Sequence, residues 1–248
     1  LGNTISLDFL GIFERLYKIS TLISSQIGTI FDNIIFPIFS RKQDDYKDSI
    51  KLYYKTIELS SIIGLILSLT LPLFGYELTL LILGDQWISY SYLLQLLLLL
   101  PFTRLLTRVG DAILRSHAMV YQSALVKFFS AVFTLVGLYI ASQYEFYWLP
   151  IVYFSSSLFT LTVLHIFISY KIKSSLLTFF LIIIKNIFSI SIIVFPIWIF
   201  IFIFQDNLSS NIMFFVKIIY FTILGYIIFK NPILLGKSFN DTIKLLIK

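Results

Sequence analysis

Charged and small polar residues recur at helical spacing within an apolar stretch near the start of the chain. The stretch from Phe9 to Asp45 is long and apolar enough to cross a bilayer. One face of a helix there would carry these residues, three or four positions apart: Glu14, Lys18, Thr21, Ser25, Gly28 and Asp32. Ionisable groups at membrane depth normally face a bundle interior or a water-filled cavity. The pattern therefore predicts a helix whose polar face lines a cavity.

Asp32 allows two interpretations. It could pair with a Lys or Arg of a neighbouring helix, or it could be a carboxylate that couples transport to a cation or a proton. Glu14 and Lys18, one turn apart, could pair with each other near the membrane surface. We expect a cavity-lining or coupling role for this set: Asp32, Ser25, Thr21, Lys18, Glu14 and Asp111.

A second stripe with the same spacing contains three arginines: Arg104, Arg108 and Arg115, with Asp111 among them. Guanidinium groups match phosphate oxygens and do not deprotonate, so the cluster could hold a phosphate or a pyrophosphate. Alternatively the side chains extend to the headgroups, most readily Arg115 and least readily Arg104. A third stripe places Lys127 among small residues, where it could line the same cavity.

The composition identifies the class of protein. The chain is 58% hydrophobic and 13% charged, far from the roughly 25% charged residues of soluble domains. It has no cysteine, and His117 and His165 are isolated, so we expect no disulfide, no metal site and no cofactor. The basic residues that give the net charge of +6 are concentrated in particular loops. This distribution is explained better by the orientation of a membrane protein than by nucleic-acid binding.

A hydropathy window of roughly 20 residues predicts an all-α polytopic protein with seven transmembrane helices. Their expected ranges are 13–39, 56–83, 90–114, 120–141, 147–170, 187–204 and 212–229. We expect five helices of one lobe in residues 1–170, two additional helices in 171–231 and a cytoplasmic amphipathic tail in 232–248. Pro37, Pro72 and Pro196 are expected to kink their helices.

Lys and Arg separate the loops into two kinds. They occur after the first, third and fifth spans and are missing from 84–89, 142–146 and 205–211, which predicts an outer N-terminus and an inner C-terminus. Glu77 is then expected to be solvated at the outer boundary, and Lys185 and Lys217 to extend to a membrane surface. Because an outer start with an odd number of spans is unusual, we interpret the chain as a fragment.

Several short motifs carry a family resemblance over residues 1–115. They are Leu10-Gly11 with Tyr17, Phe36-Pro37 with Phe39-Ser40, Asp44-Asp45, and Leu83-Gly84 with Trp87. In order and spacing they resemble the polysaccharide-transporter branch of the multidrug/oligosaccharidyl-lipid/polysaccharide (MOP) superfamily, the O-antigen and exopolysaccharide flippases with a MATE-like fold.

The resemblance implies a fold, a substrate and partners. Members have fourteen helices in two lobes, so this chain would be the C-terminal half and its partner the missing N-terminal lobe. The implied activity is non-enzymatic: undecaprenyl-pyrophosphate-linked oligosaccharide crosses the cytoplasmic membrane by alternating access, with H⁺ or Na⁺ as driving ion. Arg104, Arg108 and Lys127 would meet the pyrophosphate. Membrane lipids and the polysaccharide polymerase machinery are further implied partners.

Other functions remain open. A cation-coupled multidrug exporter could share the fold. A membrane glycosyltransferase, polymerase or ligase could use the same lipid carrier, although the predicted outer loops of about six residues are short for an active site. A receptor-like seven-helix bundle would fit the helix number and orientation, but the last span has no lysine at its centre.

Overall fold

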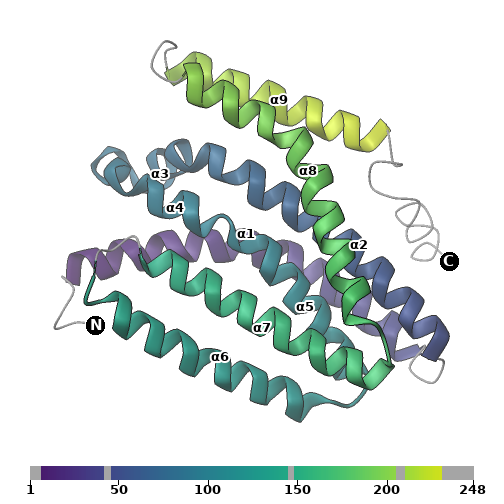
Figure 1. Cartoon of the computed structure of the whole chain (residues 1–248). Helices are drawn as coiled ribbons and strands as arrows, with labels where there is room; N and C mark the ends of the chain where they lie inside the picture. Colours follow the sequence, from purple (N-terminus) through teal and green to yellow (C-terminus); the bar gives the residue numbers. More distant parts are fainter. Residues whose placement is uncertain (1–6, 42–45, 145–147, 205–209, 231–248) are drawn as a thin grey trace.

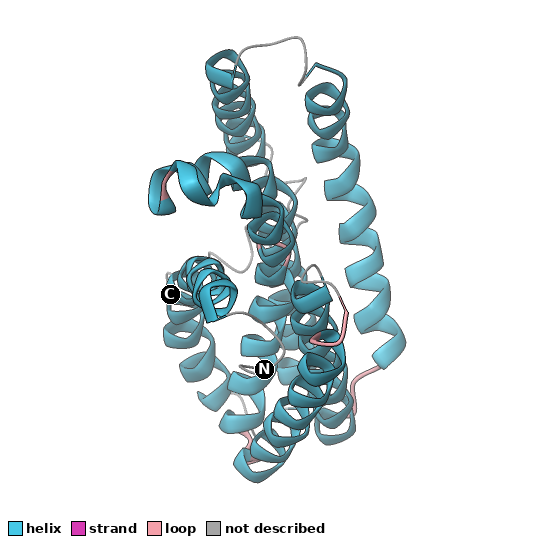
Figure 2. Cartoon of the chain, turned by 90° about the vertical axis from the view of Figure 1, so that its left-hand side faces the viewer, coloured by secondary structure: helices cyan, strands magenta, loops and turns pink. Residues whose placement is uncertain are grey.

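The computed structural model describes residues 7–41, 46–144, 148–204 and 210–230 (Figure 1). Helices are the regular structure throughout this described part of the chain (Figure 2). The all-α fold predicted from hydropathy is therefore confirmed, whereas the predicted tail at 232–248 lies outside the described residues.

The helical elements of the described residues follow one another along the chain with lengths from 4 to 35 residues. They are α1 Leu7–Arg41, α2 Tyr46–Thr70, η1 Leu71–Phe74, α3 Gly75–Leu83, η2 Asp85–Tyr90, α4 Ser91–Leu97, α5 Leu100–Ser116, α6 Val120–Ala141, α7 Trp148–Ile172, α8 Leu176–Phe204 and α9 Ser210–Lys230. Among the described residues, six stretches are long and apolar enough to cross a membrane, and a shorter apolar stretch lies at Ile212–Tyr226 in α9. The protein is therefore a multi-pass membrane protein.

The predicted second and third spans are broken helices. Helix α2 ends at Thr70 and is followed by the 3-10 helix η1, which contains Pro72, and then by α3. Proline breaks the helix here because it has no N–H to continue the α-helical bonding. A second break separates α4 from α5 just before Pro101. Ser68 of α2 satisfies the backbone there, since its hydroxyl donates to the Leu99 carbonyl (2.9 Å) and accepts from the Phe102 N–H (2.8 Å).

The start of the sixth span was predicted incorrectly, at a residue too far along the chain. The structure starts α8 at Leu176 rather than at residue 187. The polar residues Lys185 and Asn186 lower the local hydropathy, and for this reason the span was predicted to begin after them. In the structure both lie within α8: Lys185 is exposed, and Asn186 is buried and donates a hydrogen bond to Ser61 Oγ of α2 at 2.6 Å. Pro196 lies inside α8, which bends along its length (Figure 1). The fourth span has the predicted bounds.

The centre of the bundle is α5. It packs against α1, α2 and α7, and most of its side chains are buried (Figure 1). The α2 and α5 backbones approach so closely that a Cβ at Gly64 would lie 2.8 Å from the Phe102 Cα. At the periphery, α6 exposes Phe128, Leu135 and Tyr139, as expected for a surface in contact with lipid. The central position of α5 places its polar residues between three other helices.

Candidate functional site

A polar cavity of about 730 Å³ lies between α1, α5, α6 and α7. Hydroxyl groups from all four helices line it: Thr21, Ser24, Ser25, Thr107, Ser130, Thr134, Ser156, Ser157 and Thr160. Arg104 and Arg108 of α5 and Tyr17 of α1 complete its polar lining together with Tyr153 of α7. Apolar helices thus border a cavity whose lining is rich in hydrogen-bonding groups.

The hydroxyls of α6 and α7 bond to one another across the helix interface. Ser130 Oγ lies 3.1 Å from Ser156 Oγ and 2.5 Å from Thr160 Oγ1, and Thr134 Oγ1 lies 2.5 Å from Ser156 Oγ. Small polar residues allow membrane helices to approach closely and to bond to each other. We call these four residues the hydroxyl seam, which holds one wall of the cavity together.

Of the two arginines that line the cavity, Arg104 forms no ion pair with a described residue. Its guanidinium carbon lies 5.1 Å from the centre of the Tyr17 ring, and the Tyr17 and Tyr153 rings are 4.5 Å apart. Its Nη1 is buried and donates no hydrogen bond to any described residue. Buried donors almost always have a partner. A buried guanidinium N–H without one, at a hydroxyl-lined cavity, fits an anionic oxygen of a ligand.

Arg108 differs from Arg104 because it is paired. Its Nη1 lies 3.0 Å from Asp32 Oδ2 of α1. The guanidinium crosses α1 directly over Gly28, where a Cβ would overlap the Arg108 side chain. Gly28, on the predicted polar face of the first helix, therefore makes room for this ion pair.

The pair is one link in a chain of charges across α1, α5 and α6. Asp32 also contacts Arg115 (3.5 Å), and Arg115 contacts Asp111 (3.6 Å). Asp111 contacts Lys127 of α6 at 2.8 Å and accepts a hydrogen bond from Ser123. We call Asp32, Arg108, Arg115, Asp111 and Lys127 the ion-pair chain.

The structure therefore divides the residues predicted for the site. Arg104, Arg108, Thr21 and Ser25 line the cavity, whereas Asp32, Asp111 and Lys127 belong to the ion-pair chain beside it. Glu14 lines a neighbouring pocket of about 220 Å³ that shares Tyr17 and Tyr153 with the main cavity. Lys18 is exposed on α1 and lines neither. Their functional roles remain predictions.

Two features were missed from the sequence. The α7 hydroxyls could have been found, because Ser156, Ser157 and Thr160 fall on one side of a helix. The expectations for Glu77 and Lys217 were wrong: their side chains are only 15% and 8% exposed, and they pair at 2.5 Å. The pair exists because α9 contacts η1 next to α3, a tertiary contact that no local pattern indicates.

The fold is that of a polytopic membrane protein whose helices border a polar cavity. Residues 1–92 match the family model described as "Polysaccharide biosynthesis protein". The match confirms the expected resemblance to polysaccharide-biosynthesis proteins and supports a role in that process. It covers α1 to α3, and thus Tyr17, Gly28 and Asp32, and ends within α4 before the arginines. No curated protein and no solved structure gives a match.

Proposed function

We propose that the chain is part of a flippase that moves an undecaprenyl-pyrophosphate-linked oligosaccharide across the cytoplasmic membrane by alternating access. The single observation that carries the proposal is the buried, unpartnered Nη1 of Arg104 at a hydroxyl-lined cavity. The family match over residues 1–92 supports the choice of a lipid-linked sugar over a drug. The protein is then a transporter of the MOP superfamily rather than an enzyme.

The two kinds of polar group in the cavity suit the two polar parts of this substrate. A pyrophosphate carries the negative oxygens that a guanidinium binds best. The sugar offers hydroxyls, which exchange hydrogen bonds with Ser and Thr side chains that both donate and accept. Arg104 would therefore meet the pyrophosphate while the serines and threonines of α1 and α7 meet sugar.

The ion-pair chain has a separate role in the proposal. Arg108 and Lys127 are neutralised by Asp32 and Asp111, so they contribute less than Arg104 to anion binding in the resting arrangement. Asp32 is the proposed coupling residue, because an H⁺ or Na⁺ bound to its carboxylate would weaken the ion pair with Arg108. Arg108 would then become available to the substrate.

The experiment uses the complete protein that contains this chain, reconstituted in liposomes with a labelled lipid-linked oligosaccharide. Arg104→Gln should lower the transport rate at limiting substrate by about tenfold to hundredfold, since it removes a charge-assisted contact. Arg15→Gln is the matched control, because Arg15 is exposed on α1. Asp32→Asn should make transport independent of the ion gradient.

Wild-type transport by Arg104→Gln at equal protein level would contradict the proposal. Transport of a cationic drug, without transport of the labelled lipid-linked sugar, would favour the multidrug exporter. Formation of a new glycosidic bond by the reconstituted protein would favour the glycosyltransferase, polymerase or ligase.

A further inference from the structure

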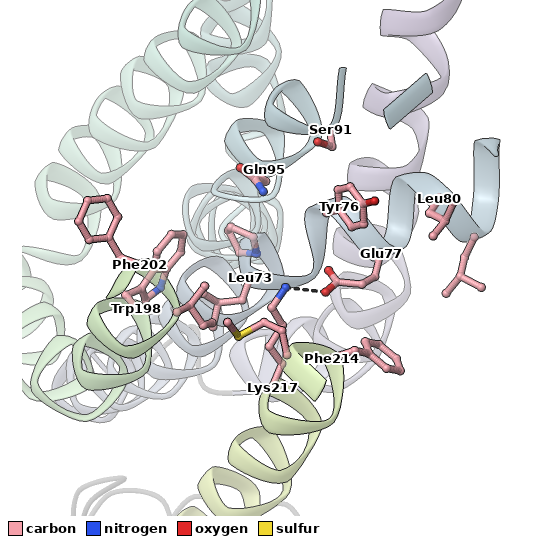
Figure 3. Close-up of a pocket in the computed structure, with 14 residues that line it drawn as sticks. Leu73, Tyr76, Glu77, Leu80, Ser91, Gln95, Trp198, Phe202, Phe214 and Lys217 are labelled. Atoms are coloured by element: carbon pink, nitrogen blue, oxygen red, sulfur yellow. Dashed lines mark hydrogen bonds and ion pairs between the residues drawn. The ribbon is translucent and has the colours of Figure 1, made fainter. Parts of the chain in front are cut away.

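A second cavity of about 720 Å³ lies on the other side of the broken second span, between η1, α3, α4, α8 and α9 (Figure 3). It shares no lining residue with the Arg104 cavity. Glu77 of α3 and Lys217 of α9 face each other in it, joined by the ion pair that the figure marks. A buried charge pair at a cavity of this size is a candidate binding site in its own right.

The pair leaves hydrogen-bonding capacity on both of its members. Lys217 Nζ bonds Glu77 Oε1, whereas Glu77 Oε2 is buried and accepts no hydrogen bond from any described residue. An ammonium has three N–H donors, and this bond uses one of them. A buried carboxylate oxygen without a donor is costly, so a ligand that donates to it would be favoured.

The walls of the cavity have opposite character. Tyr76, Ser91 and Gln95 of α3 and α4 carry polar groups, whereas Trp198 and Phe202 of α8 are large and aromatic, and Phe214 of α9 lies on the other side of the ion pair (Figure 3). A ligand that fills the cavity must therefore be amphipathic. In a multi-pass membrane protein, the most abundant amphipathic molecules in contact with such a surface are phospholipids.

We propose that this cavity binds a zwitterionic phospholipid whose headgroup carries a primary ammonium, of the phosphatidylethanolamine class. The order of charges is complementary: the lipid phosphate lies toward Lys217, the lipid ammonium donates to Glu77 Oε2, and the acyl chains lie along Phe202 and Phe214. An anionic lipid without an amine, such as phosphatidylglycerol, would meet Glu77 without a positive group of its own. A choline headgroup has no N–H to donate.

The first test uses the unaltered full chain in detergent. Short-chain phospholipids that differ only in methylation of the headgroup nitrogen, from ethanolamine to choline, are titrated and the bound lipid is counted by native mass spectrometry. Affinity should fall by about tenfold or more over the series, as expected for the loss of a charge-assisted hydrogen bond. Equal affinity for the ethanolamine and choline lipids would overturn the proposal.

Phosphoethanolamine without acyl chains is titrated alongside. It should bind much more weakly, because it cannot cover the aromatic wall. If it binds as tightly as the lipid, the cavity is a site for a soluble zwitterion and the proposal fails.

A pair of variants assigns the effect to this cavity. Glu77→Gln should reduce the preference for ethanolamine over choline headgroups to about twofold or less, because the amide carries no charge. Lys185→Gln, exposed on α8 and outside the cavity, should keep the wild-type preference. A preference retained by Glu77→Gln would overturn the assignment to this cavity. If this variant does not fold, the methylation series with the unaltered chain decides the question.

The proposed lipid site is independent of Arg104, so a failure of the lipid proposal would leave the proposed transport function unchanged.

Discussion

Arg104 and Arg108 are one helical turn apart on α5, yet they have different electrostatic surroundings. Arg108 is neutralised by Asp32, whereas Arg104 rests on the Tyr17 ring with a buried N–H that has no partner among the described residues. The difference lies in α1, which presents a carboxylate to one arginine and an aromatic face to the other. Two identical residues at helical spacing therefore differ in whether a carboxylate of a neighbouring helix pairs with them.

At the residue scale, the link between Asp32 and Arg108 should depend on Gly28. A double-mutant cycle with Asp32→Asn and Arg108→Gln should give a coupling free energy of about 1 kcal/mol, as is usual for partly exposed ion pairs. The same cycle in a Gly28→Ala background should give a value near zero, because the new Cβ occupies the place of the Arg108 side chain. Thermal unfolding in detergent measures all the variants.

Gly11→Ala is the matched control for this cycle. Gly11 lies on the same helix, and a Cβ there would meet no atom within 4 Å. Both substitutions improve helix propensity by a similar amount, about 1 kcal/mol, so the comparison isolates the contact with Arg108. Unchanged coupling in the Gly28→Ala background would show that Arg108 reaches Asp32 by another path.

At the scale of elements, hydropathy and the positions of prolines predicted the existence of the helices well, but they predicted the first and last residues of the helices less well. The α6 bounds were predicted correctly because one apolar segment runs between two short turns, and Pro72 marked the break between α2 and α3. The start of α8 could not be predicted, because the burial of Asn186 depends on Ser61, which lies far away in the sequence. The ion pair of Glu77 and Lys217 escaped prediction for the same reason.

The hydroxyl seam between α6 and α7 should stabilise that helix pair. Ser156→Ala removes bonds to Ser130 and Thr134 and should lower the free energy of unfolding by about 1 kcal/mol. Ser155→Ala is the neighbouring control, because the half-buried Ser155 donates its hydroxyl to Ile151 of its own helix and bonds to no other helix among the described residues. Equal melting temperatures for the two variants would contradict the stabilising role of the seam.

At the scale of the whole molecule, the sequence periodicity predicted which helix faces are polar but not how they combine. The stripes of the first, third and fourth spans do meet, since α1, α5 and α6 are joined by the ion-pair chain. The structure shows Asp32 paired with an arginine of a neighbouring helix, which was one of its two interpretations, whereas the pairing of Asp111 with Lys127 was not predicted. Pairing depends on the rotation of each helix about its axis, which packing determines and spacing alone does not.

The orientation in the membrane remains a prediction, and the chain is well suited to test it because it contains no cysteine. Gln86→Cys and Lys173→Cys place single thiols at exposed positions in loops expected on opposite sides. In intact cells that produce the complete protein in a form without other cysteines, a membrane-impermeant maleimide should label residue 86. Residue 173 should be labelled only after the membrane is permeabilised. The reverse pattern would show that the N-terminus of the chain faces inward.

The ion-pair chain has a mechanical consequence. Any relative sliding of α1, α5 and α6 would lengthen the ion pairs that join them, whereas movement of the three helices together leaves every pair intact. The three helices should therefore behave as one stiff body. Any rearrangement would then be concentrated elsewhere, at the breaks around Pro72 and Leu99, where the helices are already interrupted and Ser68 supplies the missing backbone bonds.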